Sequence, residues 1–201
     1  MSKIKNAKSY IRDLDIIDII LIDHRYLKEC IELLTNEHAN NFKKIEMAKG
    51  FFNVLKKHSE AEKEIVYSPL REDEDFHFNI LEAQVEHSIF DDKMSELRPK
   101  VIHAKVLKDE LAVELKVFAE LVKHHIKEEE SELLPKMREL IEEDTLKVMG
   151  HEFMKLRKMT SEDISNYPLL QEELVSWKDE VQKVSSQFLS KMDKYVESLR
   201  H

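Results

Sequence analysis

The chain has 201 residues, of which 42 % are hydrophobic, and carries a net charge of −9. Its length allows one folded domain with a real core, and its acidity argues against nucleic acid as a partner, because phosphates require a basic face. With only 2 glycines and 4 prolines, the chain lacks the turn residues that sheets and long loops need. We therefore predict an all-α fold of long helices.

Four amphipathic segments follow one another along the chain. Apolar residues recur at spacings of three and four within residues 17–34, 51–65, 76–101 and 111–133. This spacing places them on one face of a helix, as expected for the members of a helical bundle. We therefore predict an up-down-up-down four-helix bundle over residues 1–160.

Turn signals separate these segments at three places. Asn40-Asn41 lies between the first and second segments, and Ser68-Pro69, followed by an acidic run, lies between the second and third. The third turn is expected around residues 103–107, and Pro99 either ends the third helix or kinks it. A further long helix is predicted in residues 161–201, packing on the bundle or mediating self-association as a homodimer.

A histidine interrupts each of the four apolar seams. In an up-down bundle, two residues at one level lie equally far from the turn that joins their helices. The midpoint of His24 and His58 is residue 41, inside the first turn. The midpoint of His58 and His87 falls in the acidic run, and that of His87 and His125 falls in the third turn. The four histidines are therefore predicted to share one layer of the core.

Two of these histidines are followed four residues later by glutamate, in the pairs His58-x-x-x-Glu62 and His125-x-x-x-Glu129. Four residues advance a helix by about 6 Å and turn it only about 40° past a full turn, so both members of a pair point into the bundle. Two carboxylates can each bridge two metal ions, with imidazoles completing the coordination. This donor set suits two non-haem iron ions, with zinc or manganese as alternatives.

The competing interpretation is a hydrogen-bonded polar layer without metal. Buried carboxylates that lack partners cost several kcal/mol each, which favours the metal site. His124, Glu128 and Glu130 are out of phase with the seam and are interpreted as solvated or as partners behind the ligands. The remaining histidines are interpreted as non-ligands; they are His38, His77, His103, His151 and His201.

The motifs around the four histidines resemble the hemerythrin-like HHE cation-binding family. The similarity rests on IDHRYLKECIELL around His24, HSEAE around His58, EHSIF around His87 and HIKEEESELLP around His125, and it covers roughly residues 14 to 160. The resemblance implies a four-helix bundle that holds a carboxylate-bridged di-iron centre. Members of the family bind dioxygen or serve in oxygen, iron, redox or nitric oxide responses.

One position departs from the hemerythrins proper. Those proteins carry a second histidine one turn after the third-helix ligand, where this chain has Asp91. Asp91 lies off the seam and is expected to be exposed. Four histidine ligands in place of five leave an additional open or solvent-filled position, which disfavours stable oxygen carriage and favours oxidase, peroxidase or sensor chemistry.

Three functions fit these residues. The first is a di-iron protein that binds or senses dioxygen or a related small molecule such as peroxide or nitric oxide. The second is a di-iron oxidase or peroxidase, although the one Glu-x-x-His sequence, Glu74-x-x-His77, lies off the seam and disfavours the ferritin-like oxidases. The third is a helical interaction protein with a structural metal such as zinc.

The sequence also bears on location. The most apolar run, residues 16–22, is too short to span a bilayer and contains Asp18. The N-terminus MSKIKNAKSY has no apolar signal core. A single cysteine, Cys30, excludes an intrachain disulfide and fits a reducing compartment. We expect a cytoplasmic protein without a membrane partner, and we expect Cys30 to serve in packing.

Overall fold

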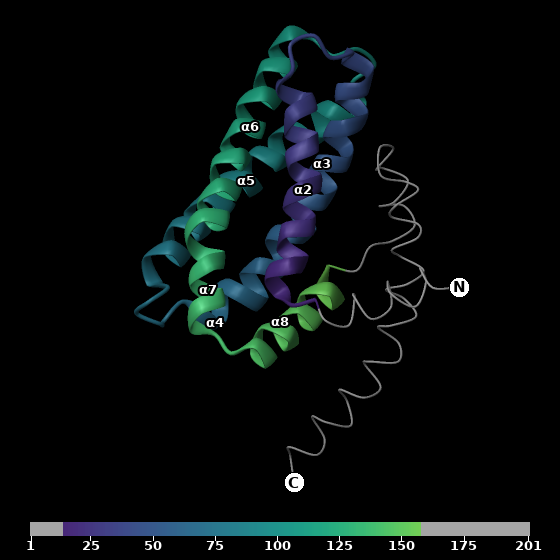
Figure 1. Cartoon of the computed structure of the whole chain (residues 1–201). Helices are drawn as coiled ribbons and strands as arrows, with labels where there is room; N and C mark the ends of the chain where they lie inside the picture. The colour runs from purple at the N-terminus through teal and green to yellow at the C-terminus, as the bar shows by residue number, and fades with distance from the viewer. Residues whose placement is uncertain (1–13, 158–201) are drawn as a thin grey trace, which may run out of the picture.

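The computed structural model describes residues 14–157 (Figure 1), and every regular element in that range is a helix. The long helices are α2 (Ile16–Thr35), α3 (Asn41–Glu62), α5 (His77–His103) and α6 (Asp109–Glu128). The shorter elements are η1 (Lys63–Tyr67), α4 (Ser68–Leu70), η2 (Glu129–Leu133), α7 (Leu134–Leu140) and α8 (Glu143–Leu156). The prediction of an all-α fold is confirmed, whereas the helix predicted in residues 161–201 lies outside the described residues.

The four long helices surround a common interior. α2 contacts α3 and α6, and α5 contacts the same two helices from the other side. Figure 1 shows the four helices running side by side, with α8 crossing the end of the molecule where α2 begins. This arrangement is compatible with the predicted up-down-up-down bundle.

The first predicted turn lies where the sequence places it. Asn40 caps α3, because its side-chain oxygen accepts hydrogen bonds from the backbone N–H groups of Phe42 at 2.8 Å and Lys43 at 3.3 Å. The third turn begins at Ala104, after a helix that continues through Pro99. Pro99 therefore does not end the third helix.

The second turn contains the acidic run, as predicted, but not Ser68-Pro69. The chain stays helical through Ser68-Pro69 as far as Leu70, and the turn occupies residues 71–76. Pro69 lies in the first turn of α4, where a missing N–H is tolerated. The Ser-Pro sequence therefore does not end the helix, because the helix accommodates a proline at this position.

Each His-x-x-x-Glu pair is followed directly by a π-helical segment. Glu62 ends α3 where η1 begins, and Glu129 is the first residue of η2. Shortly after each segment comes a proline, Pro69 or Pro135. Proline cannot donate its share of the helical hydrogen bonds, and a widened turn is one way for a helix to absorb such a defect, often at a functional site.

Two apolar clusters fill the interior, one on each side of the four histidines. The larger cluster is centred on Phe51, Phe52, Phe90 and Phe118. The other gathers the first turns of α2, the segments η1 and η2, α7 and α8. None of the helices in residues 14–157 combines the length and apolarity that a bilayer crossing requires.

Candidate metal centre

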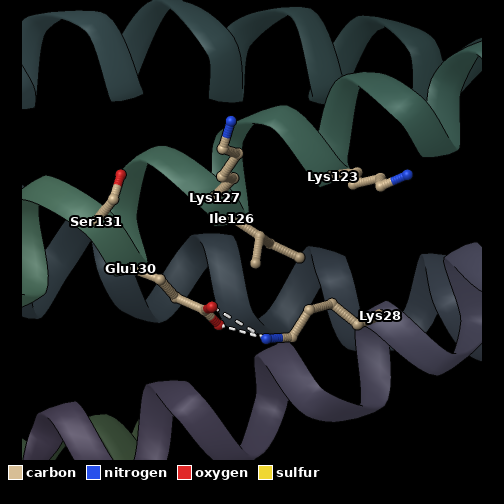
Figure 2. Close-up of a pocket in the computed structure, with 6 residues that line it drawn as sticks. All are labelled: Lys28, Lys123, Ile126, Lys127, Glu130 and Ser131. Carbon is tan, nitrogen blue, oxygen red and sulfur yellow. Dashed lines mark hydrogen bonds and ion pairs between the residues drawn. The ribbon is translucent and has the colours of Figure 1, made fainter.

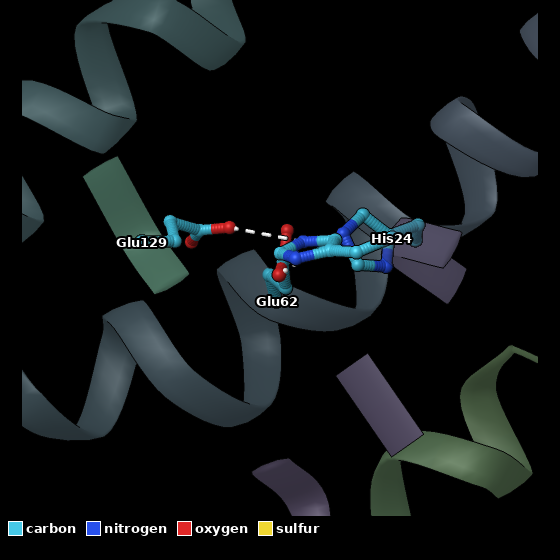
Figure 3. Close-up of side chains that lie close together, drawn as sticks. His24, Glu62 and Glu129 are labelled. Atoms are coloured by element: carbon cyan, nitrogen blue, oxygen red, sulfur yellow. Dashed lines mark ion pairs between the residues drawn. The ribbon is translucent and has the colours of Figure 1, made fainter. Parts of the chain in front are cut away.

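The six predicted ligands meet in one buried layer between the apolar clusters. None of these side chains is more than 4 % exposed. Each of the four long helices contributes at least one of them, and the segment after α6 contributes one more: His24 from α2, His58 and Glu62 from α3, His87 from α5, His125 from α6 and Glu129 from η2. Figure 3 shows Glu62 and Glu129 close to His24, with a dashed line for the ion pair between Glu129 and His24.

The two carboxylates lie between the histidines. Glu62 places Oε1 3.1 Å from Nε2 of His58 and Oε2 3.6 Å from Nε2 of His87. Glu129 places Oε2 3.3 Å from Nε2 of His24 and 3.4 Å from Nε2 of His125. Each carboxylate therefore joins a histidine of the α2–α3 side to a histidine of the α5–α6 side.

These donors form two groups that share a residue. His24, His58, Glu62 and Glu129 each offer an atom within 4.8 Å of the others, and Glu62, His87 and His125 do the same. Because Glu62 belongs to both groups, an ion in one group would have a neighbour in the other. The geometry is suited to a pair of cations that share carboxylate ligands.

The donor atoms fit a cation better than they fit one another. Within the described residues, Nε2 of His24, Nε2 of His58, both oxygens of Glu62 and Oε2 of Glu129 are buried without a hydrogen-bond partner. Nε2 of His87 also lies 3.0 Å from Nε2 of His125, and two such nitrogens repel unless a proton or a cation lies between them. Buried polar atoms are rarely left unpaired, so the layer is built for positive charge.

Three of the histidines are held from behind by carboxylates. Nδ1–H of His58 donates to Asp23 at 3.1 Å, that of His125 to Glu86 at 2.6 Å and that of His24 to Glu130 at 3.2 Å. Such a bond fixes the ring so that Nε2 faces the ion, and it makes the imidazole a stronger ligand. His87 is the exception, since its Nδ1 is buried without a hydrogen-bond partner in residues 14–157.

The carboxylates behind the rings have cationic partners of their own at two positions. Asp23 is buried and forms an ion pair with Arg157, which follows α8. Glu130 binds Lys28 at 2.8 and 3.0 Å, at the edge of a surface groove of about 370 Å³ between α2 and α6 (Figure 2). Buried His24 is thus separated from the groove by one side chain, whereas His58 is backed by a buried pair.

Tyr67 completes the layer, although its sequence position did not mark it. Its hydroxyl donates a hydrogen bond of 2.7 Å to Oε1 of Glu129 and lies 3.2 Å from Nε2 of His87. Burial, together with the charges of Glu129 and Glu62, raises the pKa of this phenol well above its usual value. The hydroxyl therefore stays protonated and acts as a donor.

Burial and the neighbouring charges shift the pKa values of the layer's histidines in different directions: those of His24, His58 and His125 are raised, and that of His87 is lowered. Burial opposes charge on His58, but the attraction of Glu62 and the hydrogen bond to Asp23 outweigh it and raise its pKa to about 10. Burial and repulsion from His125 instead hold the pKa of His87 well below its usual value. Since imidazoles must be deprotonated to coordinate, metal binding would displace the proton from His58.

Two residues interpreted as non-ligands, His124 and Asp91, lie outside the layer. His124 is exposed and contacts Glu128 at 3.4 Å on the surface, where these two residues and Glu86 form a separate group that could hold an ion. Asp91 is 52 % exposed and pairs with Lys63 at 2.6 Å. Within residues 14–157, the two buried donor groups of the layer thus contain four histidines, and Asp91 belongs to neither group.

The comparison with protein families agrees with this geometry. The Hemerythrin HHE cation binding domain matches residues 15–137, which include all six predicted ligands and end before α8. No curated protein and no solved structure gives a significant match. Because the match spans more than half of the chain, the protein belongs to the hemerythrin HHE cation-binding domain family.

Proposed function

We propose that the buried layer holds two iron ions as a non-haem, carboxylate-bridged di-iron centre in an up-down-up-down bundle, and that the protein binds or senses dioxygen or a related small molecule such as peroxide or nitric oxide. The ligands are His24, His58, Glu62, His87, His125 and Glu129. The observation that carries the proposal is the position of Glu62 and Glu129, each of which reaches a histidine on both sides of the layer.

The donor set supports iron over a purely structural ion. Four imidazoles and two carboxylates are intermediate between the thiolate-rich sites that favour zinc and the all-oxygen sites that favour magnesium or calcium. Iron supplies electrons and an open coordination position for the small molecule. The surrounding apolar side chains exclude water, and Tyr67 holds Glu129 by a hydrogen bond.

A di-iron oxidase or peroxidase is the second candidate, and Tyr67 is the observation that favours it. Its hydroxyl oxygen lies 2.7 Å from Oε1 of Glu129 and 3.2 Å from Nε2 of His87, so it could donate a proton inside the layer. Continuous consumption of hydrogen peroxide by the iron-loaded protein, reduced in Tyr67→Phe, would support turnover. Reversible binding of one small molecule without consumption would support carriage or sensing.

Metal content is the first test of the di-iron proposal. The full chain is folded anaerobically with ferrous iron, desalted and analysed by plasma mass spectrometry. We expect roughly two irons per chain, and we expect both to be lost in His58→Ala and in Glu129→Ala. Glu128→Ala is the matched control for Glu129→Ala, because it removes the same side chain one residue away and outside the layer. His124→Ala removes a surface histidine, and both controls should keep the iron.

The other outcomes separate the alternatives. Retention of zinc in preference to iron, with loss of helical structure on chelation, would favour a structural metal. Failure of the wild-type chain to retain any metal would mean that the layer is a polar hydrogen-bonded layer. We also propose a cytoplasmic location, which the single, buried Cys30 supports.

A further inference from the structure

We infer that α8 and the residue after it belong to the metal centre, although both lie beyond the family match: Arg157 positions the ligand His58 by holding Asp23. The inference rests on the proposed function, because it concerns how firmly one ligand of the proposed ions is held. The match ends at residue 137, and α8 begins at Glu143. The contact of Arg157 with Asp23 therefore lies outside the matched region.

The contact runs through one buried carboxylate. Asp23 Oδ2 accepts the hydrogen bond from Nδ1–H of His58 at 3.1 Å, and the same oxygen faces Nε of Arg157. Asp23 is 2 % exposed and Arg157 is 6 % exposed. A buried carboxylate with two partners has little freedom to turn, so Arg157 fixes the oxygen toward which His58 points.

The helix itself also touches the ligand. The ring of Phe153, which is fully buried, packs edge-on against the His58 ring, with ring centres 5.9 Å apart and an angle of 77° between their planes. His58 is therefore restrained at its Nδ1 by the hydrogen bond to Asp23 and at its ring by the contact with Phe153. Both restraints depend on α8 remaining in place.

Gly150 lets α8 approach the first turn of α2 closely. A Cβ atom at this position would lie 2.8 Å from the backbone nitrogen of Ile16 and 2.9 Å from the carbonyl carbon of Asp15. Both neighbours are backbone atoms, which cannot turn aside as a side chain could. Gly150→Ala should therefore push α8 outward without changing any charge or any ligand.

Arg138 provides a comparison for Arg157 with the same chemistry, although its side chain is 46 % exposed. It joins α7 to the start of α2 through an ion pair with Asp15, as Arg157 joins α8 to Asp23. Asp15 caps α2 by accepting hydrogen bonds from the backbone N–H groups of Ile17 and Asp18. Within residues 14–157 it has no hydrogen bond or ion pair with a predicted ligand. Removal of Arg138 therefore tests the loss of an arginine–aspartate tether without touching the metal centre.

The experiment measures how fast the loaded protein releases its metal. Full-length wild type, Arg157→Gln, Arg157→Lys, Gly150→Ala and Arg138→Gln are loaded with ferrous iron and, in parallel, with zinc. Release into excess chelator is then followed at a temperature where circular dichroism shows every variant to be folded. We expect Arg157→Gln to release metal about 10-fold faster than the wild type, the lower bound for loss of a group behind a ligand. Gly150→Ala should also release metal faster, and Arg157→Lys should release it more slowly than Arg157→Gln. Arg138→Gln should release metal at the wild-type rate.

The outcomes distinguish this inference from the proposed function. If the wild type holds zinc but not iron, the di-iron proposal fails and the zinc series still tests the role of Arg157. If Arg157→Gln and Arg138→Gln release metal equally fast, or if Gly150→Ala matches the wild type, α8 is only a structural helix and the inference is wrong. A wild type that binds neither metal would overturn both.

Discussion

The two His-x-x-x-Glu pairs have the same sequence pattern, the same π-helical continuation and a proline after it, yet their surroundings differ. His58 is backed by Asp23 and Arg157, both buried. His125 is backed by Glu86, whose side chain is 19 % exposed. A short motif specifies which atoms reach the centre, while the packing of other elements decides how rigidly each ligand is held.

Removal of the two backing carboxylates should show the largest contrast. Asp23→Ala leaves the Arg157 guanidinium buried without its partner, which typically costs 3–5 kcal/mol. Glu86→Ala removes a partly solvated carboxylate and should cost about 1 kcal/mol. Urea unfolding of both variants, prepared without metal, measures the free energies of unfolding. Equal losses would mean that the two sides of the centre are equally constrained.

The pH dependence of stability tests the His58 side further. The raised pKa of His58, about 10, means that its stabilisation is complete below the unfolded value near 6.5 and is lost as the pH rises toward 10. Between pH 6.5 and 8.5 the loss of this proton should cost the metal-free protein about 2 kcal/mol, since one proton is worth up to ~1.4 kcal/mol per pH unit. The raised pKa values of His24 and His125 add to the decline in the same direction. In the zinc-loaded protein this decline should disappear, because ligating imidazoles carry no proton at Nε2.

Tyr67→Phe should have a smaller effect on the free energy of unfolding, and it tests the contact with Glu129 instead of the contacts of His58. The substitution keeps the ring and removes the hydrogen bond to Glu129, so we expect a loss of about 1.5 kcal/mol in the metal-free protein. Glu129→Gln and the double variant complete a mutant cycle that isolates this pair. A coupling energy near zero would show that the hydroxyl has another partner of equal strength.

Cys30 offers the mildest test, because it is modified only when the bundle opens. Burial raises the pKa of its thiol to about 12, so almost no thiolate is present at pH 8. A maleimide should leave the folded wild type and Glu86→Ala unlabelled over hours and should label Asp23→Ala faster. Rapid labelling of the wild type would contradict the buried position of Cys30.

The regular α-helices could be predicted from the sequence, and so could the layer in which the four histidines meet. Spacings of three and four hold as long as each helix is a regular α-helix, and the midpoints of the histidines then locate the turns. The first of these midpoints is Asn41, the first residue of α3, directly after its cap Asn40. The same arithmetic brought His24, His58, His87 and His125 to one layer.

Tyr67 escaped prediction for a physical reason. It follows Glu62 by five residues, a spacing that turns away from the seam in an α-helix. In η1 the hydrogen bonds run between residues five apart, so the residue returns to the inner face. Asp23 did leave a signal, because it continues the spacing of the buried residues Ile16, Ile20, Leu27 and Cys30. Arg157 left none, since its partner is 134 positions away.

The polar layer has a consequence for how the chain chooses among alternative packings. If one helix slid by a single turn, its histidine would enter a level now occupied by residues such as Phe90 or Leu55, and an apolar side chain would face Glu62 and Glu129. Such a shifted packing would break the hydrogen bonds that three of the histidines now make with the carboxylates behind them, a cost that ordinary leucine seams do not impose. The layer therefore fixes the register of the four helices before any ion binds.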